Sequence, residues 1–115
     1  MHEMGIALQI VEIATASIPD DIENAQIERV NLKVGKLAAI VPDSLRFCFD
    51  IVAKDTPLKG AKLVIKEIDV VARCNDCQTN WTITEPVFSC KNCNSSSIEI
   101  LSGRELDIDS IEIVE

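Results

Sequence analysis

Four of the five cysteines form two Cys-x-x-Cys turns, and their spacing predicts chemistry more directly than any other feature. The turns are Cys74–Cys77 and Cys90–Cys93, with twelve residues between them. Two intervening residues let both sulfurs of a turn reach one ion, so two turns complete a tetrahedral shell with Zn–S distances of about 2.3 Å. We therefore expect a structural zinc ion on Cys74, Cys77, Cys90 and Cys93. A closed shell of four thiolates leaves no position for substrate or water.

Two other uses of the cysteine turns are weighed against zinc. Iron in a rubredoxin-like site would imply electron transfer, and a redox dithiol would need only one of the two turns. Residues 73–97 are polar and poor in aliphatic side chains, so metal binding would supply the energy that folds them. We expect Trp81, Ile83 and Phe88 to form the small core of this segment.

The chain contains a single histidine, His2, and its place next to the terminal amine is chemically unusual. The amine of Met1, the backbone nitrogen of His2 and its Nδ1 could close two fused chelate rings on one metal. Glu3 could add a fourth donor through its backbone nitrogen or its carboxylate. Nitrogen donors in a plane suit Ni(II) or Cu(II). A terminal histidine is also commonly just a solvated residue, and the residues alone leave both readings open.

No catalytic centre is expected. The fifth cysteine, Cys48, falls on the apolar face of an expected helix, where a free thiol usually acts as a small buried hydrophobe. As a nucleophile it would have to recruit His2 as its base. We therefore expect the protein not to be an enzyme.

Hydrophobic periodicity predicts alternating helices and strands around the cysteine turns. Apolar residues at three- and four-residue steps favour a helix over the first eighteen residues, and alternation favours a strand over residues 27–36. A second helix is expected from Pro42 to about residue 54, with Leu45, Cys48, Phe49 and Val52 facing inward, and a further strand over residues 61–71. Alternation returns after Gly103 and shifts phase at Asp109-Ser110, which suggests a bulge or a kink.

Composition and charge exclude several classes of partner. Hydrophobic residues make up 47% of the chain, yet nineteen acidic residues outnumber eleven scattered basic ones, for a net charge of −8. Binding to nucleic acid or to a membrane surface normally requires a clustered basic face, so neither is expected. No apolar run approaches the length of a membrane helix, and the first residues do not resemble a signal peptide. We expect a cytoplasmic protein, where paired cysteines bind metal rather than form disulfides.

Over its full length the sequence resembles one known family. The segments that carry the resemblance are the two cysteine turns, Met1-His2-Glu3-Met4, Val34-Gly35-Lys36-Leu37, Pro42-Asp43-Ser44-Leu45-Arg46-Phe47, Gly60-Ala61-Lys62-Leu63 and Gly103-Arg104-Glu105-Leu106. In their order along the chain they resemble the HypA-type hydrogenase maturation factors, which are nickel metallochaperones. Lys91 stands where the family often has proline, and Gly5 stands where many members have serine. Neither departure removes a metal ligand.

The resemblance implies both metal sites and a two-part α+β fold. Nickel is implied at Met1, His2 and Glu3, with His2 indispensable, and structural zinc on the four cysteines. The implied fold has two helices on a three-stranded mixed sheet, with an inserted four-cysteine module like a zinc ribbon. We place the nickel-binding domain at residues 1–72 and 103–115 and the zinc-binding module at residues 73–102.

The function implied by the resemblance is a carrier that takes Ni(II) as cargo and helps insert it into a nickel–iron hydrogenase. The implied partners are a GTP-hydrolysing accessory protein and the large-subunit precursor of the hydrogenase, and homodimer formation stays open. Two other functions are weighed. A zinc-ribbon adaptor would bind proteins or, against the charge, nucleic acid. A metal-dependent hydrolase would need an open metal position and an acid–base pair.

Overall fold

The computed structural model describes residues 3–114; residues 1, 2 and 115 are outside the described part. The elements in chain order are α1 (Glu3–Ala16), β1 (Gln26–Gly35), the short 3₁₀ helix η1 (Lys36–Ala38), α2 (Pro42–Val52), β2 (Lys62–Ile68), β3 (Val70–Cys74), β4 (Asn80–Ile83), β5 (Ile98–Ser102) and β6 (Leu106–Val114). Among the described helices, none is long and apolar enough to cross a membrane.

The described residues form two compact units. The first unit comprises Met1–Lys33, Ile40–Lys66 and Asp107–Glu115, and the second comprises Val34–Ala39 and Glu67–Leu106. The chain therefore passes between the units four times, and each unit is built from segments that are distant in sequence. Each unit has a sheet of its own, with strand orders β2-β1-β6 and β4-β3-β5.

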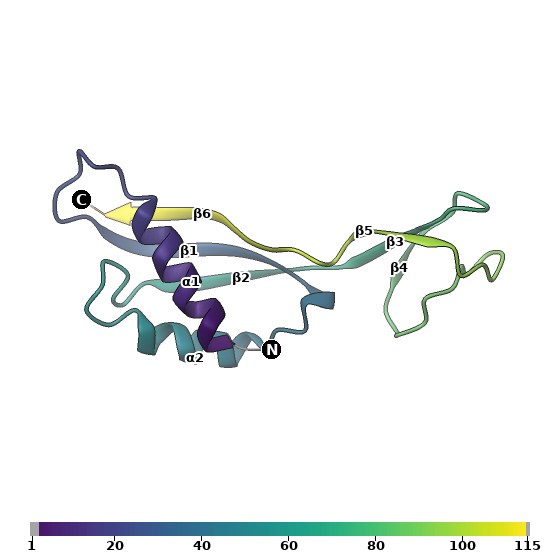
Figure 1. Cartoon of the computed structure of the whole chain (residues 1–115), viewed down its shortest axis with the longest axis horizontal. Helices are drawn as coiled ribbons and strands as arrows, with labels where there is room; N and C mark the ends of the chain where they lie inside the picture. Colours follow the sequence, from purple (N-terminus) through teal and green to yellow (C-terminus); the bar gives the residue numbers. More distant parts are fainter. Residues whose placement is uncertain (1–2, 115) are drawn as a thin grey trace. The chain divides into compact units, whose positions relative to one another are not determined.

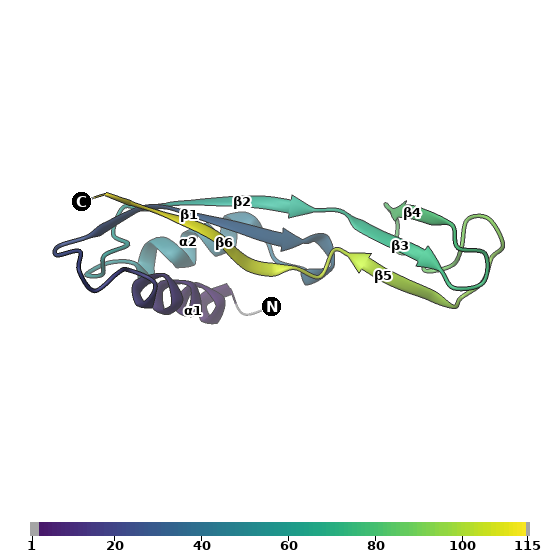
Figure 2. The same cartoon turned by 90° about the horizontal axis from the view of Figure 1, so that it is seen from above.

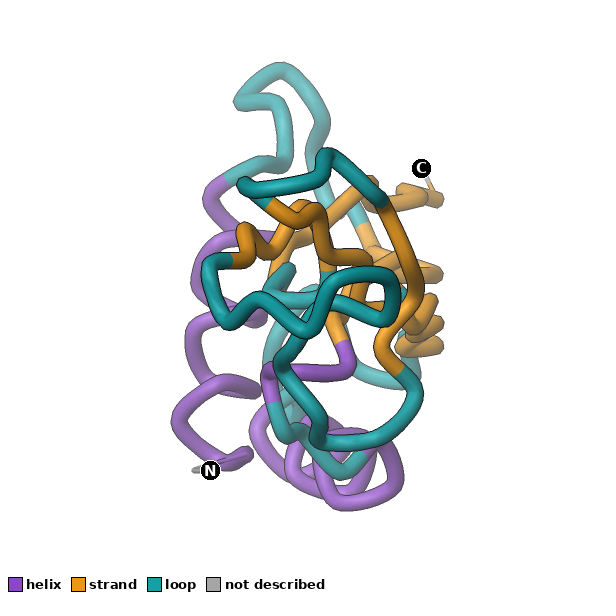
Figure 3. The backbone as a smooth tube through the Cα atoms, turned by 90° about the vertical axis from the view of Figure 1, so that its right-hand side faces the viewer, coloured by secondary structure: helices purple, strands orange, loops and turns teal. Residues whose placement is uncertain are grey.

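The first unit is the expected α+β arrangement of two helices on a mixed three-stranded sheet. Strands β1 and β2 run in the same direction and β6 runs against them (Figure 1). Both helices cover one face of this sheet (Figures 2 and 3). A strand, a crossover helix and a parallel strand over residues 26–68 match the predicted order, because parallel neighbours need a crossover connection.

Small and large apolar side chains fill the core between the helices and the sheet. Ala7 and Ala14 on α1 are fully buried, so this helix can approach its neighbours closely. Leu45 and Phe49 on α2 are buried as predicted, whereas Cys48 and Val52 are only half-buried. Along β6 the inward positions change phase after Asp109, which agrees with the predicted irregularity.

The single strand predicted over residues 61–71 is wrong, because two strands occupy that stretch and the second runs on to Cys74. β2 and β3 are separated by Asp69, and they belong to different sheets. Both polar groups of Asp69 are used there: its carboxylate lies 2.6 Å from Lys36 Nζ, and its carbonyl accepts a 2.8 Å hydrogen bond from the Ser102 hydroxyl. A continuous apolar alternation therefore serves two separate cores, which periodicity alone does not reveal.

The second unit brings the segment around Gly35 next to the segment around Gly103. β3 pairs antiparallel with β4 and with β5. In the same unit the end of β1 and the following η1 are held by hydrogen bonds from Gly35 N to Glu105 O at 2.7 Å and from Leu37 N to Gly103 O at 2.8 Å. A Cβ on Gly35 would lie 2.0 Å from Gly103 O, and one on Gly103 would lie 2.8 Å from a Val70 side-chain carbon. Close backbone approach explains why both positions are glycine.

Candidate metal centre

The second unit gathers the four turn cysteines into one cluster. Cys74 is the last residue of β3, and the other three lie in the turns that follow. All four sulfurs lie within 4.8 Å of one another. Cys74 Sγ is 3.6 Å from Cys93 Sγ, and Cys77 Sγ is 3.5 Å from Cys90 Sγ. A tetrahedral ion with Zn–S bonds of about 2.3 Å requires sulfurs about 3.8 Å apart, so the donor set and its spacing fit zinc.

The two turns repeat the same backbone geometry. In each, the first cysteine donates its N–H to the carbonyl five residues later, and its own carbonyl accepts the N–H from four residues later. The N···O distances are 2.9 Å for Cys74 to Thr79, 3.0 Å for Gln78 to Cys74, 2.8 Å for Cys90 to Ser95 and 2.9 Å for Asn94 to Cys90. Gln78 and Asn94, each directly after a turn, adopt positive φ angles of 64° and 61°. This left-handed residue closes each turn at a strain cost that only glycine avoids.

Backbone N–H groups point at the first sulfur of each turn. The N–H of Asp76 lies 3.4 Å from Cys74 Sγ, and the N–H of Asn92 lies 3.3 Å from Cys90 Sγ. Hydrogen bonds of this kind stabilise the ionised sulfur, which is the form that binds metal. Cys74 and Cys90 are also the two buried members of the cluster.

Contacts between the turns hold the cluster in place without help from the sulfurs. Asn75 N donates to Ser97 O at 2.9 Å, and the Asn75 side chain donates to the Ser97 hydroxyl at 3.3 Å. The Ser95 hydroxyl donates to the Asp76 carboxylate. These contacts join the first turn itself to the loop after the second turn, so the ligand positions are supported by a surrounding shell.

The cysteine thiols differ in acidity. The pKa of Cys77 is lowered to about 6, first by the Thr79 hydroxyl 3.2 Å from its sulfur, then by the Thr79 backbone and the Asn92 side-chain amide. At Cys93 the backbone of Ser95 lowers the pKa, but the neighbouring Cys74 sulfur, desolvation and the other two thiols outweigh it and raise the pKa to about 12. Four thiolates so close together repel one another, and a divalent cation offsets that repulsion.

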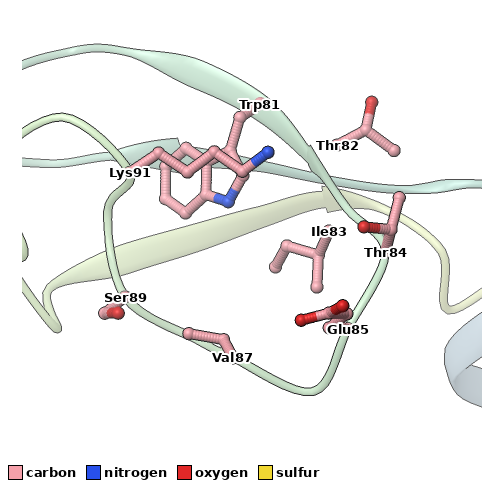
Figure 4. Close-up of a pocket in the computed structure, with 8 residues that line it drawn as sticks. All are labelled: Trp81, Thr82, Ile83, Thr84, Glu85, Val87, Ser89 and Lys91. Atoms are coloured by element: carbon pink, nitrogen blue, oxygen red, sulfur yellow. The ribbon is translucent and has the colours of Figure 1, made fainter.

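A loop of the same unit borders an open pocket, and the expected small core does not form there. The pocket has a volume of about 350 Å³ and is lined by residues between Trp81 and Lys91 (Figure 4). Trp81 and Ile83 are only half-buried, and Phe88 is 46% exposed, so the prediction that these three form the core is wrong. The buried apolar residues of β3 in this unit are instead Val70 and Ala72.

Of the three residues predicted to bind nickel, only Glu3 lies in the described part of the chain. Met1 and His2 are outside it. Glu3 is the first residue of α1, and its Oε2 accepts a 3.4 Å hydrogen bond from the backbone N–H of Val41, which directly precedes α2. Nothing in the sequence pattern predicted this contact, because it joins residues 38 positions apart.

The sequence pattern predicted the four cysteines of the cluster but not the polar side chains that hydrogen-bond around them. Thr79, Asn92 and the Asp76–Ser95 pair each touch a ligand or tie the turns together, and none belongs to a spacing motif. The only available signal was the excess of Asn, Ser and Thr around the cysteines, residue types that often hydrogen-bond to nearby backbone.

Comparison with known proteins agrees with this fold and cluster. The family model described as "Hydrogenase/urease nickel incorporation, metallochaperone, hypA" matches residues 1–113. The chain is 61% identical over 115 residues to the hydrogenase maturation factor HypA of Desulfosudis oleivorans, covering 100% of both chains. It is 47% identical over 116 residues to that of Chlorobium limicola, covering 100% of this chain and 98% of the relative.

Two solved structures share the fold. The solution structure of the Ni metallochaperone HypA from Helicobacter pylori superposes with a TM-score of 0.63 at 22% identity, over 99% of this chain and 98% of the other. A second structure, described as the solution structure of HypA protein, gives a TM-score of 0.72 at 22% identity, over 99% and 97% of the chains. The chain therefore belongs to the HypA family of metallochaperones, which act in nickel incorporation into hydrogenase and urease.

Proposed function

We propose that Ni(II) is carried at the N-terminus, by the Met1 amine, by the backbone nitrogen and imidazole of His2, and by Glu3. The observation that supports this is the position of Glu3, which opens α1 directly after the terminal residues. Its carboxylate makes one long contact, 3.4 Å to the Val41 N–H, in an exposed setting. Such a weakly held carboxylate can exchange that contact for a metal ion, and later release the ion, at little energetic cost.

A site formed mainly by the first two residues suits transfer of a cargo ion. Few of its donors come from rigid secondary structure, so an acceptor could replace them one at a time. Protons compete for the same nitrogens, and nickel binding should weaken as pH falls through the imidazole pKa of about 6.5.

Nickel titration of the untagged protein by calorimetry tests this proposal. His2→Ala removes the only imidazole, and two extra residues before Met1 move the free amine away. Both changes should abolish one-to-one nickel binding and leave zinc content and circular dichroism unchanged, because His2 precedes the first helix. If either protein binds one nickel with unchanged affinity, the cargo is held elsewhere.

The four cysteines have a structural role in this proposal. Zinc on Cys74, Cys77, Cys90 and Cys93 would hold residues 73–102 as a module inserted between residues 1–72 and 103–115, which carry the nickel terminus. A bound zinc ion supplies the energy that orders this hydrophobe-poor stretch. Cys74→Ala should release zinc and unfold the stretch, with a change in the fluorescence of Trp81, while the helices keep their circular dichroism. Iron in the purified protein would contradict the assignment.

The partners follow from the cargo. We propose delivery to the large-subunit precursor of a nickel–iron hydrogenase together with a GTP-hydrolysing accessory protein, in the cytoplasm and without catalysis by this chain. The net charge of −8 fits the absence of nucleic-acid and membrane partners. Co-purification of the chain with the precursor, compared between native protein and His2→Ala, tests delivery. Gel filtration with light scattering decides between monomer and homodimer.

A further inference from the structure

The face of the first unit's sheet opposite the helices carries a ladder of charged side chains. On this face, Arg29 and Lys33 of β1 face acidic residues of β6. Arg29 Nη1 is 3.3 Å from Glu112 Oε2, and Lys33 Nζ is 3.3 Å from Asp109 Oδ1. The side chain of Asn31, between them, donates to the Ser110 hydroxyl at 3.0 Å. The acidic side chains of β6 thus neutralise the basic side chains of β1, along the side of β1 that faces β6.

The other side of β1 has no such acidic strand. β2 is its neighbour there and the last strand of the sheet. Its exposed positions are Lys62, Val64, Lys66 and, next to the end of the strand, Glu67. Among the described residues, no carboxylate oxygen lies within 4.0 Å of either lysine's amine. From Arg46 to the end of β2 at Ile68 the chain has five basic and three acidic residues, a net charge of +2 in a chain of net charge −8.

A groove runs along this edge. It has a volume of about 440 Å³ and is lined by Arg46 and Asp50 of α2 and by residues 61–65. Arg46 Nε donates a 3.3 Å hydrogen bond to the carbonyl of Leu63, so the backbone of β2 at Leu63 faces the groove. The N–H and C=O of one strand residue point the same way, so the N–H of Leu63 faces the groove as well. Edge groups of this kind can pair with a further strand.

We propose that the edge of β2 is a docking surface for an acidic, extended segment of a partner protein, which adds to the sheet as a fourth strand. Carboxylates at alternate positions of that segment would face Lys62 and Lys66, as Asp109 and Glu112 face Lys33 and Arg29 on the other side. The main chain would pair with outward groups such as those of Leu63, displacing Arg46. Added strands of this kind gain affinity from the main chain and specificity from alternate side chains.

The lysines argue against a second copy of β2 as the added strand. Two β2 edges paired with each other would place lysines near lysines, which is destabilising. Lysine on an edge strand is also a common guard against self-association. The same two lysines, Lys62 and Lys66, attract an acidic strand. They therefore both disfavour self-pairing and select the partner.

A designed peptide tests the surface in the full-length protein. The probe is a fluorescein-labelled octapeptide in which valine alternates with glutamate, followed by fluorescence anisotropy at low salt. A second probe has the same side chains but is N-methylated at alternate residues, so it keeps its charge and loses its pairing N–H groups. We expect the first probe to bind and the second to bind at least about tenfold more weakly.

Two double variants with the same net charge provide the matched comparison. Lys62→Glu/Lys66→Glu changes the edge, and Lys54→Glu/Lys59→Glu changes two exposed lysines of the same unit that lie outside β2 and do not line the groove. The edge variant should lose affinity for the probe by at least about tenfold, and the control should lose no more than about twofold to threefold. Amide shifts on binding should centre on residues 61–66.

Four outcomes would overturn the proposal. They are equal binding of the N-methylated probe, equal losses in the two double variants, shifts centred elsewhere, or no binding at millimolar peptide. A different result would assign the edge to a second copy of the chain. In that case the protein self-associates, the probe does not compete with the self-association, and Lys62→Glu/Lys66→Glu abolishes it. None of these readouts involves nickel, so the result is independent of the terminal metal site.

Discussion

Replacing Gly35 with alanine tests the close backbone crossing in the second unit. Gly35 has φ −72° and ψ 145°, which any residue adopts, so only crowding should matter. The new Cβ would lie 2.0 Å from Gly103 O. Ordinary carbon–oxygen contacts are about 3.3–3.6 Å, so the two segments would have to separate by more than 1 Å. That shift breaks the hydrogen bonds from Gly35 to Glu105 and from Leu37 to Gly103.

The expected cost outweighs the expected gain. Losing two backbone hydrogen bonds in a packed crossing should cost about 2–4 kcal/mol. Replacing glycine lowers the entropy of the unfolded chain and returns only about 0.4–1 kcal/mol. We therefore expect Gly35→Ala to lower the free energy of unfolding by roughly 1–3 kcal/mol, a large part of the total for a small domain.

Urea unfolding measures this change in two ways. Fluorescence of Trp81, the only tryptophan, follows the second unit, and far-ultraviolet circular dichroism follows the whole chain. The matched control is Gly5→Ala in α1, where a Cβ meets nothing within 4 Å and alanine should stabilise the helix by about 0.5–1 kcal/mol. If Gly35→Ala is as stable as the native protein, or more so, the crowding argument is refuted.

The remaining predictions concern the core and the cysteine turns. Phe49→Ala should cost about 3–5 kcal/mol in urea unfolding, because this side chain is 1% exposed in the first unit. Asn94→Val should weaken zinc binding in competition with a chromophoric chelator, because a β-branched residue is strained at φ 61°, and Asn94→Gly should not. In metal-free, reduced protein, alkylation of Cys77 followed by mass spectrometry should show a midpoint near pH 6, and Thr79→Val should move it upward. Because this pKa is lowered from about 8.5, the stabilisation by ionised Cys77 is complete above that pH and is lost as pH falls through about 6.

Local patterns in the sequence were enough to predict most of the first unit. The helix at the N-terminus, the strand ending at Gly35 and the helix beginning at Pro42 all occur, with caps and periods that act over a few residues. The clustering of the four cysteines could also be predicted, because the spacing of two Cys-x-x-Cys turns lets all four sulfurs reach one ion. Features that depend on contacts between residues distant in sequence could not be predicted from local patterns.

The division at Asp69 and the exposure of Phe88 are the clearest examples. Residues 61–74 show one apolar alternation, and only the pairing of β3 with β4 and β5 assigns its second half to another sheet. Phe88 is an aromatic residue in a polar segment, so a core position was the natural expectation. In the structure it is 46% exposed, and the buried apolar residues of the second unit include Val70 and Ala72 of β3 instead.

The interleaving of the two units has a consequence for synthesis on the ribosome. Strand β6, which completes the first unit's sheet, is made after all the other described elements. Val34–Ala39 emerges early but belongs to a unit whose other residues end at Leu106. At roughly 5–20 residues per second, the early segment waits several seconds for the strands it will join. The second unit therefore cannot finish folding before Leu106 has been made, and the first unit cannot finish before β6 has been made.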